Sequence, residues 1–190
     1  KISYRPAGLM AASDWYSIKV KGKQTHGAAP WGGIDPIVVS AQIIQGLQTI
    51  ISRQTELTKE AAVISVGRIQ AGIRENIIPE EAFFAGTIRT LDAGMQDLIH
   101  EKIKLTATKI AESAGATAVV DIKKMTPVTY NDPSLTARMG GVLEKSLGRE
   151  RVFQVPPVMG SEDFGVFGLD NHQIPGFYFY VGVYSPEQMA

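Results

Sequence analysis

Between residues 15 and 124 the spacing of apolar side chains switches repeatedly between two periods, and this succession restricts the possible folds more than any other feature of the sequence. Alternation at every second residue, typical of half-buried strands, marks residues 15–21, 62–69, 82–89 and 117–124. Spacing of three or four residues, typical of helices, marks residues 37–53 and 98–114. The resulting order, β-α-β-β-α-β, predicts an α+β ferredoxin-like domain over residues 14–125, with two helices covering one face of a four-stranded antiparallel sheet.

Both predicted helices carry start signals. Asp35 is a favourable N-cap and is followed by Pro36, which suits the first position of a helix. Asp92 is the second predicted N-cap, and Gly115 ends the second helical pattern. The connection between the second and third strands, QAGIRENIIPEE, contains glycine and proline and has the length of a hairpin loop or a little more.

The segments on either side of this domain do not complete a second one. After residue 125 the sequence predicts a helix from about Ser134 to Leu147, the loop PPVMGSEDFG and a strand, FYFYVGV, at residues 177–183. We therefore interpret residues 1–13 and 126–190 as fragments of a neighbouring domain.

The composition excludes several classes of partner. The chain has 190 residues, with 19 basic and 19 acidic side chains, and no run of Lys or Arg exceeds two residues, so nothing indicates binding to nucleic acid or to an anionic membrane. It has no cysteine, which excludes disulfides, thiolate nucleophiles and zinc sites with sulfur ligands. Without an apolar run of about 20 residues or a signal-peptide pattern, we expect a soluble protein; the compartment stays open, with the cytoplasm favoured.

Three polar residues follow or end the predicted strands. In a split βαβ topology the first two strands run in the same direction, so the loops that carry His26 and Asn76 leave the same end of the sheet. The third strand runs the opposite way, which places Arg89 at the other end. If all three residues serve one ligand, two copies of the domain are needed.

Each of these residues also has a structural interpretation. His26 lies among small residues that let a ligand approach, and an imidazole can donate a hydrogen bond to a carbonyl, but from composition alone a surface loop histidine without a function is the simpler interpretation. Asn76 can stabilise a turn, and Arg89 can hold a carboxylate or form a simple ion pair.

The remaining candidates are weaker. His100 shares a helix face with Gln96 and is expected to be solvated, and His172 is expected in a loop. The neighbouring carboxylates Glu162 and Asp163 can bind a metal, although capping of a helix by Ser161 or Asp163 is the simpler interpretation. The chain lacks H-E-x-x-H, P-loop, G-x-S-x-G and G-x-G-x-x-G motifs, so these patterns alone indicate a ferredoxin-like module of unknown role.

A longer set of motifs gives a more specific answer. In order along the chain they read G-K-Q-T-H-G-A-A-P-W-G-G-I-D-P-I, I-S-R, V-G-R-I-Q-A-G, N-I-I-P, G-T-I-R-T-L, S-E-D-F-G and P-G-F-Y-F-Y-V-G. Together they closely resemble the M20 metallopeptidase family, and within it the N-acyl amino acid amidohydrolases that include hippurate hydrolase and the auxin-conjugate hydrolases. The resemblance covers essentially the whole chain.

The resemblance implies a division into domains and a set of roles. Residues 14–125 would be the ferredoxin-like lid, which also forms a homodimer, and residues 1–13 and 126–190 would be fragments of an α/β metallohydrolase catalytic domain. His26 would reach into the partner's active site and polarise the scissile carbonyl, helped by Asn76. Arg89 would bind the substrate carboxylate in its own subunit, and Gly160 and Ser161 would line the substrate pocket.

The same resemblance places the metal site outside this chain. In the family, two divalent ions, zinc or manganese, are held by residues upstream of the segment that matches Lys1 and by one residue beyond Ala190, and a Glu-Glu pair upstream of the lid supplies the general base. The adjacent Glu80 and Glu81 follow N-I-I-P and do not match that pair. We therefore expect this chain to bind no metal and to be inactive by itself. The alternative is a non-catalytic dimerisation or ligand-sensing module, which the absence of upstream metal ligands in the full-length sequence would favour.

Overall fold

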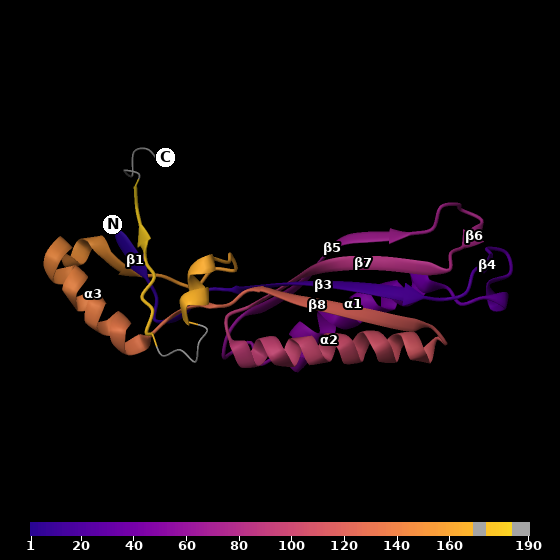
Figure 1. Cartoon of the computed structure of the whole chain (residues 1–190), viewed down its shortest axis with the longest axis horizontal. Helices are drawn as coiled ribbons and strands as arrows, with labels where there is room; N and C mark the ends of the chain where they lie inside the picture. Colours follow the sequence, from indigo (N-terminus) through magenta and orange to yellow (C-terminus); the bar gives the residue numbers. More distant parts are fainter. Residues whose placement is uncertain (169–173, 184–190) are drawn as a thin grey trace. The chain divides into compact units, whose positions relative to one another are not determined.

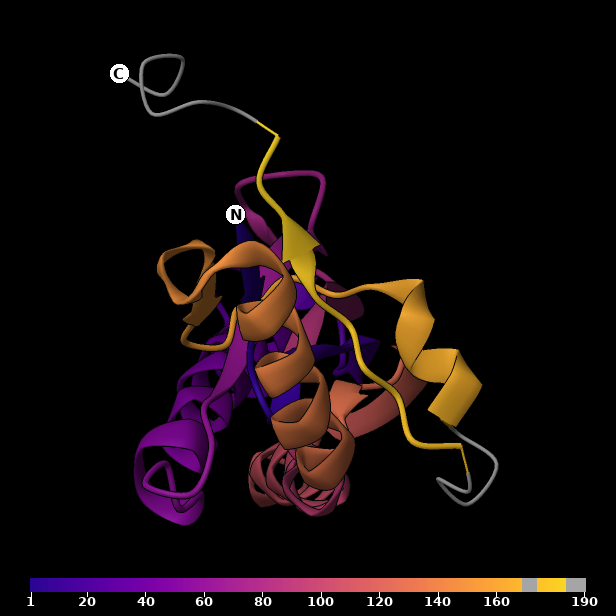
Figure 2. The ribbon, with the colours of Figure 1, turned by 90° about the vertical axis from the view of Figure 1, so that its left-hand side faces the viewer.

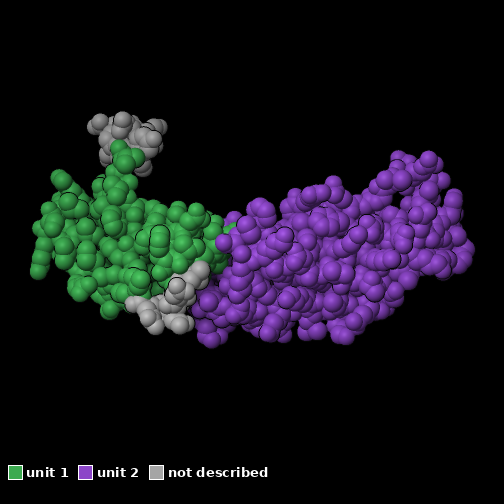
Figure 3. Space-filling model, viewed as in Figure 1, with its two compact units in different colours: residues 1–13, 126–190 green, residues 14–125 purple. Residues whose placement is uncertain are grey.

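The structure is a computed structural model that describes residues 1–168 and 174–183. The chain folds into two compact units, which Figure 3 shows in different colours. Unit 1 comprises residues 1–13 and 126–190, and unit 2 is Asp14–Met125. No helix in the described ranges is long and apolar enough to cross a membrane.

Unit 2 is the ferredoxin-like α+β domain that the sequence predicts. Its four-stranded sheet has the order β5-β7-β3-β8, and both helices lie on one side of it (Figure 1). The strands are β3 (Ala12–Lys21), β5 (Ala62–Ala71), β7 (Glu81–Thr90) and β8 (Thr117–Thr126), and the helices are α1 (Pro36–Gln54) and α2 (Ala93–Ser113). The short strands β4 (Thr25–His26) and β6 (Ile77–Ile78) pair with each other.

Apolar side chains between the sheet and the helices form the core of unit 2. Strand β3 contributes alternate residues to it, because successive side chains of a strand point to opposite faces. The fully buried members include Ile18, Val20, Ile43, Leu47, Phe84, Ile88, Ile99 and Ile103. The Tyr16 hydroxyl donates a hydrogen bond to the Ser65 carbonyl at 3.2 Å, and burial raises the pKa of Tyr16 to about 12. Tyr16 therefore stays a hydrogen-bond donor at neutral pH.

Both helices of unit 2 begin at the predicted caps. The Asp35 carboxylate accepts hydrogen bonds from the backbone N–H groups of Ile37 and Val38, and that of Asp92 accepts one from Met95. Strand β3 begins at Ala12, three residues before the predicted start, because its first residues are small or polar and carry no apolar alternation.

The described residues of unit 1 form two small sheets and one α-helix. Strand β1 (Ile2–Tyr4) lies between β10 (Val152–Gln154), which is parallel to it, and β11 (Tyr180–Val181), which is antiparallel. Strand β2 (Ala7–Met10) pairs with β9 (Thr129–Asn131). Helix α3 (Pro133–Leu147) begins at the N-cap Asp132 and stands in front in Figure 2. Three 3-10 turns complete the described elements: η1 (Pro30–Gly32) in unit 2, and η2 (Arg149–Arg151) and η3 (Asp163–Gly168) in unit 1.

The C-terminal part differs from its prediction. The sequence predicts a strand at residues 177–183, but only Tyr180 and Val181 pair as a strand. Within unit 1 the preceding residue Tyr178 is held beside Arg5 by Asn131, whose buried amide donates to the carbonyls of Arg5 and Tyr178 at 2.8 Å each. The position of His172 lies outside the described residues.

Candidate functional site

The structure brings His26 and Asn76 together at one end of the sheet of unit 2. His26 ends β4 and is opposite Ile77 of β6, so the residue that precedes Ile77 lies beside the histidine turn. The Gly27 N–H donates a hydrogen bond to the Asn76 carbonyl at 2.8 Å, which joins the two loops directly. A Cβ on Gly27 would come within 3.2 Å of that carbonyl oxygen, so glycine suits this close approach.

A network of backbone hydrogen bonds fixes the turn that follows His26. The Ala29 N–H donates to the His26 carbonyl at 2.8 Å, and the Thr25 hydroxyl donates to the Ala29 carbonyl at 3.1 Å. Lys23 and Ile34 exchange two backbone hydrogen bonds at the base of the loop. The glycines and prolines of residues 21–36 thus build a tied loop whose backbone groups are largely paired.

The His26 side chain is exposed on this turn. Its Nδ1 faces the backbone N–H of Ala28 at 3.0 Å. In the described part of the chain, Nε2 has no hydrogen-bond partner, and neither does the side-chain amide of Asn76. Both groups are therefore available to a ligand or to another protein surface.

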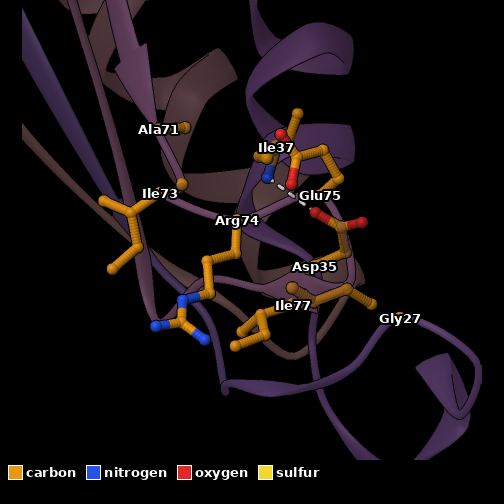
Figure 4. Close-up of a pocket in the computed structure, with 10 residues that line it drawn as sticks. Gly27, Asp35, Ile37, Ala71, Ile73, Arg74, Glu75 and Ile77 are labelled. Carbon is orange, nitrogen blue, oxygen red and sulfur yellow. Dashed lines mark hydrogen bonds between the residues drawn. The ribbon is translucent and has the colours of Figure 1, made fainter.

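A hollow of about 550 Å³ lies beside this turn. Gly27 borders it on one side, and the residues that connect β5 to β6, among them Ile73, Arg74 and Glu75, border it on another (Figure 4). Asp35 also borders it, but its carboxylate is engaged in capping α1, with 2.8 Å to the Ile37 N–H. The hollow thus combines apolar side chains with one cation and two carboxylates.

Arg89 lies at the opposite end of the sheet, near the end of β7. It is opposite Val63 at the start of β5, whereas the Asn76 loop follows the end of β5 at Ala71. Eight residues of strand separate these points, which is roughly 25 Å at the usual rise of about 3.3 Å per residue. His26 and Arg89 of one chain therefore do not share a site.

The guanidinium of Arg89 lacks partners within the described residues. Its Nη1 is buried without a hydrogen bond, and no described carboxylate forms an ion pair with it. The ion pair that the sequence left open as an alternative is thus absent from the described part of the chain. A half-buried guanidinium with unused donors is suited to bind a carboxylate.

Gly160 and Ser161 lie in unit 1, in the loop before η3. Gly160 is exposed, and its carbonyl accepts a hydrogen bond from the Ala11 N–H at 2.9 Å. The predicted cap by Ser161 or Asp163 is wrong, because the Glu162 carboxylate accepts the Asp163 N–H at 2.8 Å and the Phe164 N–H at 3.4 Å. Glu162 takes this role because its side chain folds back onto the first turn of η3.

The prediction of a solvated His100 is also wrong. Only 9% of His100 is exposed, and its Nε2 lies 2.6 Å from Oδ2 of Asp14, which is 1% exposed. The Gln96 amide donates to both carboxylate oxygens of Asp14, at 3.0 and 2.7 Å. A signal for this cluster exists in the sequence: Asp14 alternates in phase with the buried Tyr16, and a buried carboxylate needs polar partners.

The described residues do not fit a metal site. No group of three or more His, Cys, Asp or Glu side chains that could hold an ion occurs in residues 1–168 and 174–183. Glu162, which the sequence left open as a metal ligand, has one oxygen engaged in the cap of η3.

Comparison with known proteins identifies the family. The peptidase dimerisation domain of the M20 family matches residues 12–115. Thermostable carboxypeptidase 2 of Saccharolobus solfataricus is 35% identical over 94% of this chain and 44% of its own length. Hippurate hydrolase of Campylobacter jejuni is 34% identical over 88% of this chain and 44% of its own length.

A solved structure agrees with these matches. The Bacillus subtilis YXEP protein, described as a dinuclear metal binding peptidase from the M20 family, superposes with a TM-score of 0.75 at 30% identity, over 94% of this chain and 42% of its own length. The chain thus spans less than half the length of the relatives it matches. Fold, motifs and matches agree that the chain belongs to the M20 peptidase family and contains its dimerisation domain.

Proposed function

We propose that this chain is part of a metal-dependent M20 hydrolase that cleaves the amide bond of N-acyl amino acids or small peptides. The names of its relatives, a hippurate hydrolase and a carboxypeptidase, support this class of substrate. The described residues do not fit a metal site, so we assign the two divalent ions, zinc or manganese, to the longer protein and to none of the roles below.

The observation that carries the proposal is the separation of two unpaired polar groups on one sheet. Among the described residues, His26 Nε2 has no partner at one end, and Arg89 has guanidinium donors without partners roughly 25 Å away. An N-acyl amino acid is far too short to span that distance. A histidine from one subunit and an arginine from the other can meet the same substrate, which explains why a dimerisation domain would carry both.

In this proposal the two ends of the substrate are bound by different subunits. His26 reaches the partner's active site and donates a hydrogen bond to the scissile carbonyl, whose oxygen gains negative charge as water attacks. The amide of Asn76, on the adjoining loop, supports that contact. Arg89 binds the substrate carboxylate in its own subunit, and Gly160 and Ser161 line the substrate pocket.

Two exposed apolar side chains support a protein surface around His26. Trp31 is 84% exposed on the turn after His26, and Ile73 is 96% exposed on the loop before Asn76. We count these two side chains in favour of a covered surface because both lie on the loops that carry His26 and Asn76, and exposed apolar side chains that gather in one region mark protein contacts. The His26 end of unit 2 thus has the chemistry of a surface that inserts into a partner.

The carboxylate contact of Arg89 provides the test of this function. In the longer protein, we expect Arg89→Ala to raise KM for N-acyl amino acids roughly 10-fold to 100-fold, the scale of losing hydrogen bonds to a charged group. The measurement is the rate of amino acid release from hippurate, N-acetyl amino acids and dipeptides.

Two controls separate binding from damage to the fold. The same substrates with the carboxylate converted to a primary amide should respond weakly to Arg89→Ala, and Arg89→Lys should recover part of the affinity because it keeps the charge but loses the bidentate geometry. An unchanged KM for the free acids would contradict the role of Arg89, and a longer protein that hydrolyses none of the panel would contradict the function.

The edge of the sheet indicates how two copies associate. Strands β5 and β8 are its edges, and β8 carries the charged residues Asp121, Lys123 and Lys124 on its exposed positions. The second half of β5 has a single charge, Arg68, and Ile69 is 54% exposed there. Because charged side chains discourage pairing of edge strands, β5 is the edge better suited to a second copy.

We therefore expect sedimentation velocity of this chain to show a homodimer. Ile69→Lys places a charge on the β5 edge and should shift the equilibrium towards monomer, whereas Val119→Lys, at a 67% exposed position of β8, should not. A strict monomer for the unmodified chain would remove the cross-subunit geometry. Equal effects of the two substitutions would contradict the choice of β5.

A further inference from the structure

The hydrogen bond between the Ala28 backbone and the His26 ring constrains where the ring carries its proton. A backbone N–H can only donate, and it faces Nδ1 of His26 at 3.0 Å. Nδ1 must therefore present a lone pair. In a neutral imidazole one nitrogen carries hydrogen and the other accepts, so the hydrogen is on Nε2.

The surrounding backbone holds the Ala28 N–H in that position. The three consecutive N–H groups after His26 each have a different partner: Gly27 donates to the Asn76 carbonyl, Ala28 to the ring, and Ala29 to the His26 carbonyl. The bonds on both sides fix the peptide that carries the middle N–H. The ring is thus tied to a backbone that is itself tied to the neighbouring loop.

We propose that the backbone N–H of Ala28 is a positioning group that keeps His26 in the neutral Nε2–H tautomer, with Nε2 directed away from its own turn. This rests on the function proposed above, in which Nε2 donates a hydrogen bond to the scissile carbonyl of the partner's substrate. The accepting nitrogen is already occupied, so His26 serves as a hydrogen-bond donor and not as a general base. The turn supplies a ready donor without first having to protonate the ring.

The opposite tautomer, with the hydrogen on Nδ1, would give His26 a different chemical role. A hydrogen on Nδ1 would point at the hydrogen of the Ala28 N–H, and the bond at 3.0 Å would become a repulsive contact. Nε2 would then be an acceptor and could take a proton from water. The two tautomers therefore correspond to different chemical roles, and the ring nitrogens distinguish them.

The test is long-range ¹H–¹⁵N NMR of the ¹⁵N-labelled chain at about pH 8, above the pKa of a free imidazole. The chain has three histidines, and the His26 ring signals are those lost in His26→Gln. We expect a protonated Nε2, an unprotonated Nδ1, and a scalar coupling across the hydrogen bond between the Ala28 amide nitrogen and Nδ1. A protonated Nδ1, or a tautomer average like that of free imidazole without such coupling, would overturn the proposal.

Two substitutions at position 28 isolate the N–H. Ala28→Pro removes it, and in the described part of the chain no other hydrogen bond uses it, so the ring should shift towards a mixture of tautomers. Ala28→Gly keeps the N–H and should leave the ring signals unchanged. If the Gly27 amide shift shows an intact turn, an unchanged tautomer in Ala28→Pro would contradict the positioning role. If Ala28→Pro disrupts the turn, the test is the scalar coupling in the unmodified chain, and its absence would contradict the proposal.

This measurement is independent of catalysis. It reads the ring in this chain without substrate, metal or turnover. A locked Nε2–H tautomer in a protein whose longer form hydrolyses nothing would leave the positioning role standing and remove the proposed function. An active enzyme whose His26 ring averages freely between tautomers would contradict the positioning role and leave the proposed function standing.

Discussion

Replacing His26 with alanine in the longer protein is expected, from the proposed function, to lower kcat by about 10² to 10³-fold, the loss typical of removing one hydrogen-bond donor from a developing oxyanion. The ring is exposed, and the Gly27 and Ala29 N–H groups bond to backbone carbonyls and not to the ring, so the turn and the dimer should stay intact. The measurement is kcat with hippurate alongside sedimentation of the same sample. His26→Gln should retain more activity than His26→Asn, because the glutamine amide can place an N–H near the position of Nε2 and the asparagine amide cannot.

Mixing the two impaired variants, with substrate well below KM, tests whether His26 acts across the dimer. A His26→Ala subunit keeps Arg89, and an Arg89→Ala subunit keeps His26, so each mixed dimer contains one complete site and one doubly defective site. After subunit exchange, about a quarter of the wild-type activity should return, since half of the dimers are mixed and one of their two sites is complete. Near-normal turnover of His26→Ala, or no recovery on mixing, would contradict the cross-subunit role.

The second large effect concerns the stability of unit 2. Removing His100 leaves the buried Asp14 carboxylate with Gln96 as its remaining partner, so we expect His100→Ala to lower the free energy of unfolding by about 3 to 5 kcal/mol, the range for breaking a buried pair. Urea unfolding followed by tryptophan fluorescence measures this free energy of unfolding for unit 2 separately from unit 1. The chain has two tryptophans, Trp15 and Trp31, and both lie in unit 2.

Two further variants, Lys109→Ala and Asp14→Asn, show whether the loss of stability in His100→Ala comes from the buried contact with Asp14. Lys109→Ala breaks an ion pair with Glu112 on the same helix, but both side chains are more than half exposed, so its effect should stay within about 0.5 kcal/mol. Asp14→Asn keeps the shape and one accepting oxygen and should cost less than His100→Ala. A loss below about 1 kcal/mol for His100→Ala would show that the cluster contributes little to stability.

The helices of unit 2 were predictable because their signals are local. Asp35 and Asp92 cap the helices they precede, and in α2 the predicted apolar stripe includes the buried Ile99, Ile103 and Ala107. In α1 the buried face is rotated from the predicted stripe: Ile37 is 41% exposed, whereas Val39, Ile43 and Ile50 are buried. The strand order followed from connectivity, since few arrangements satisfy a β-α-β-β-α-β succession.

The errors occurred where distant residues decide the outcome. His100 follows Ile99 of the apolar stripe on α2. Its burial depends on its contact with Asp14 of β3, which lies 86 residues away in sequence. The aromatic run at residues 177–179 alternates like a strand, yet strand pairing requires a partner, and in the described chain only Tyr180 and Val181 have one. The hydrogen bond from Ala28 to the His26 ring depends on the detailed path of a turn, which composition does not specify.

The places where the chain enters and leaves unit 2 have an architectural consequence. It enters on β3 and leaves on β8, which are neighbours in the sheet, and in unit 1 the flanking residues Met10 and Thr129 are themselves paired. Unit 2 is therefore a nested insertion with adjoining ends. A short linker can therefore join the two ends of unit 1 in place of unit 2. Residues 14–125 can be deleted, or moved into another protein, as one segment without changing how the strands of unit 1 connect.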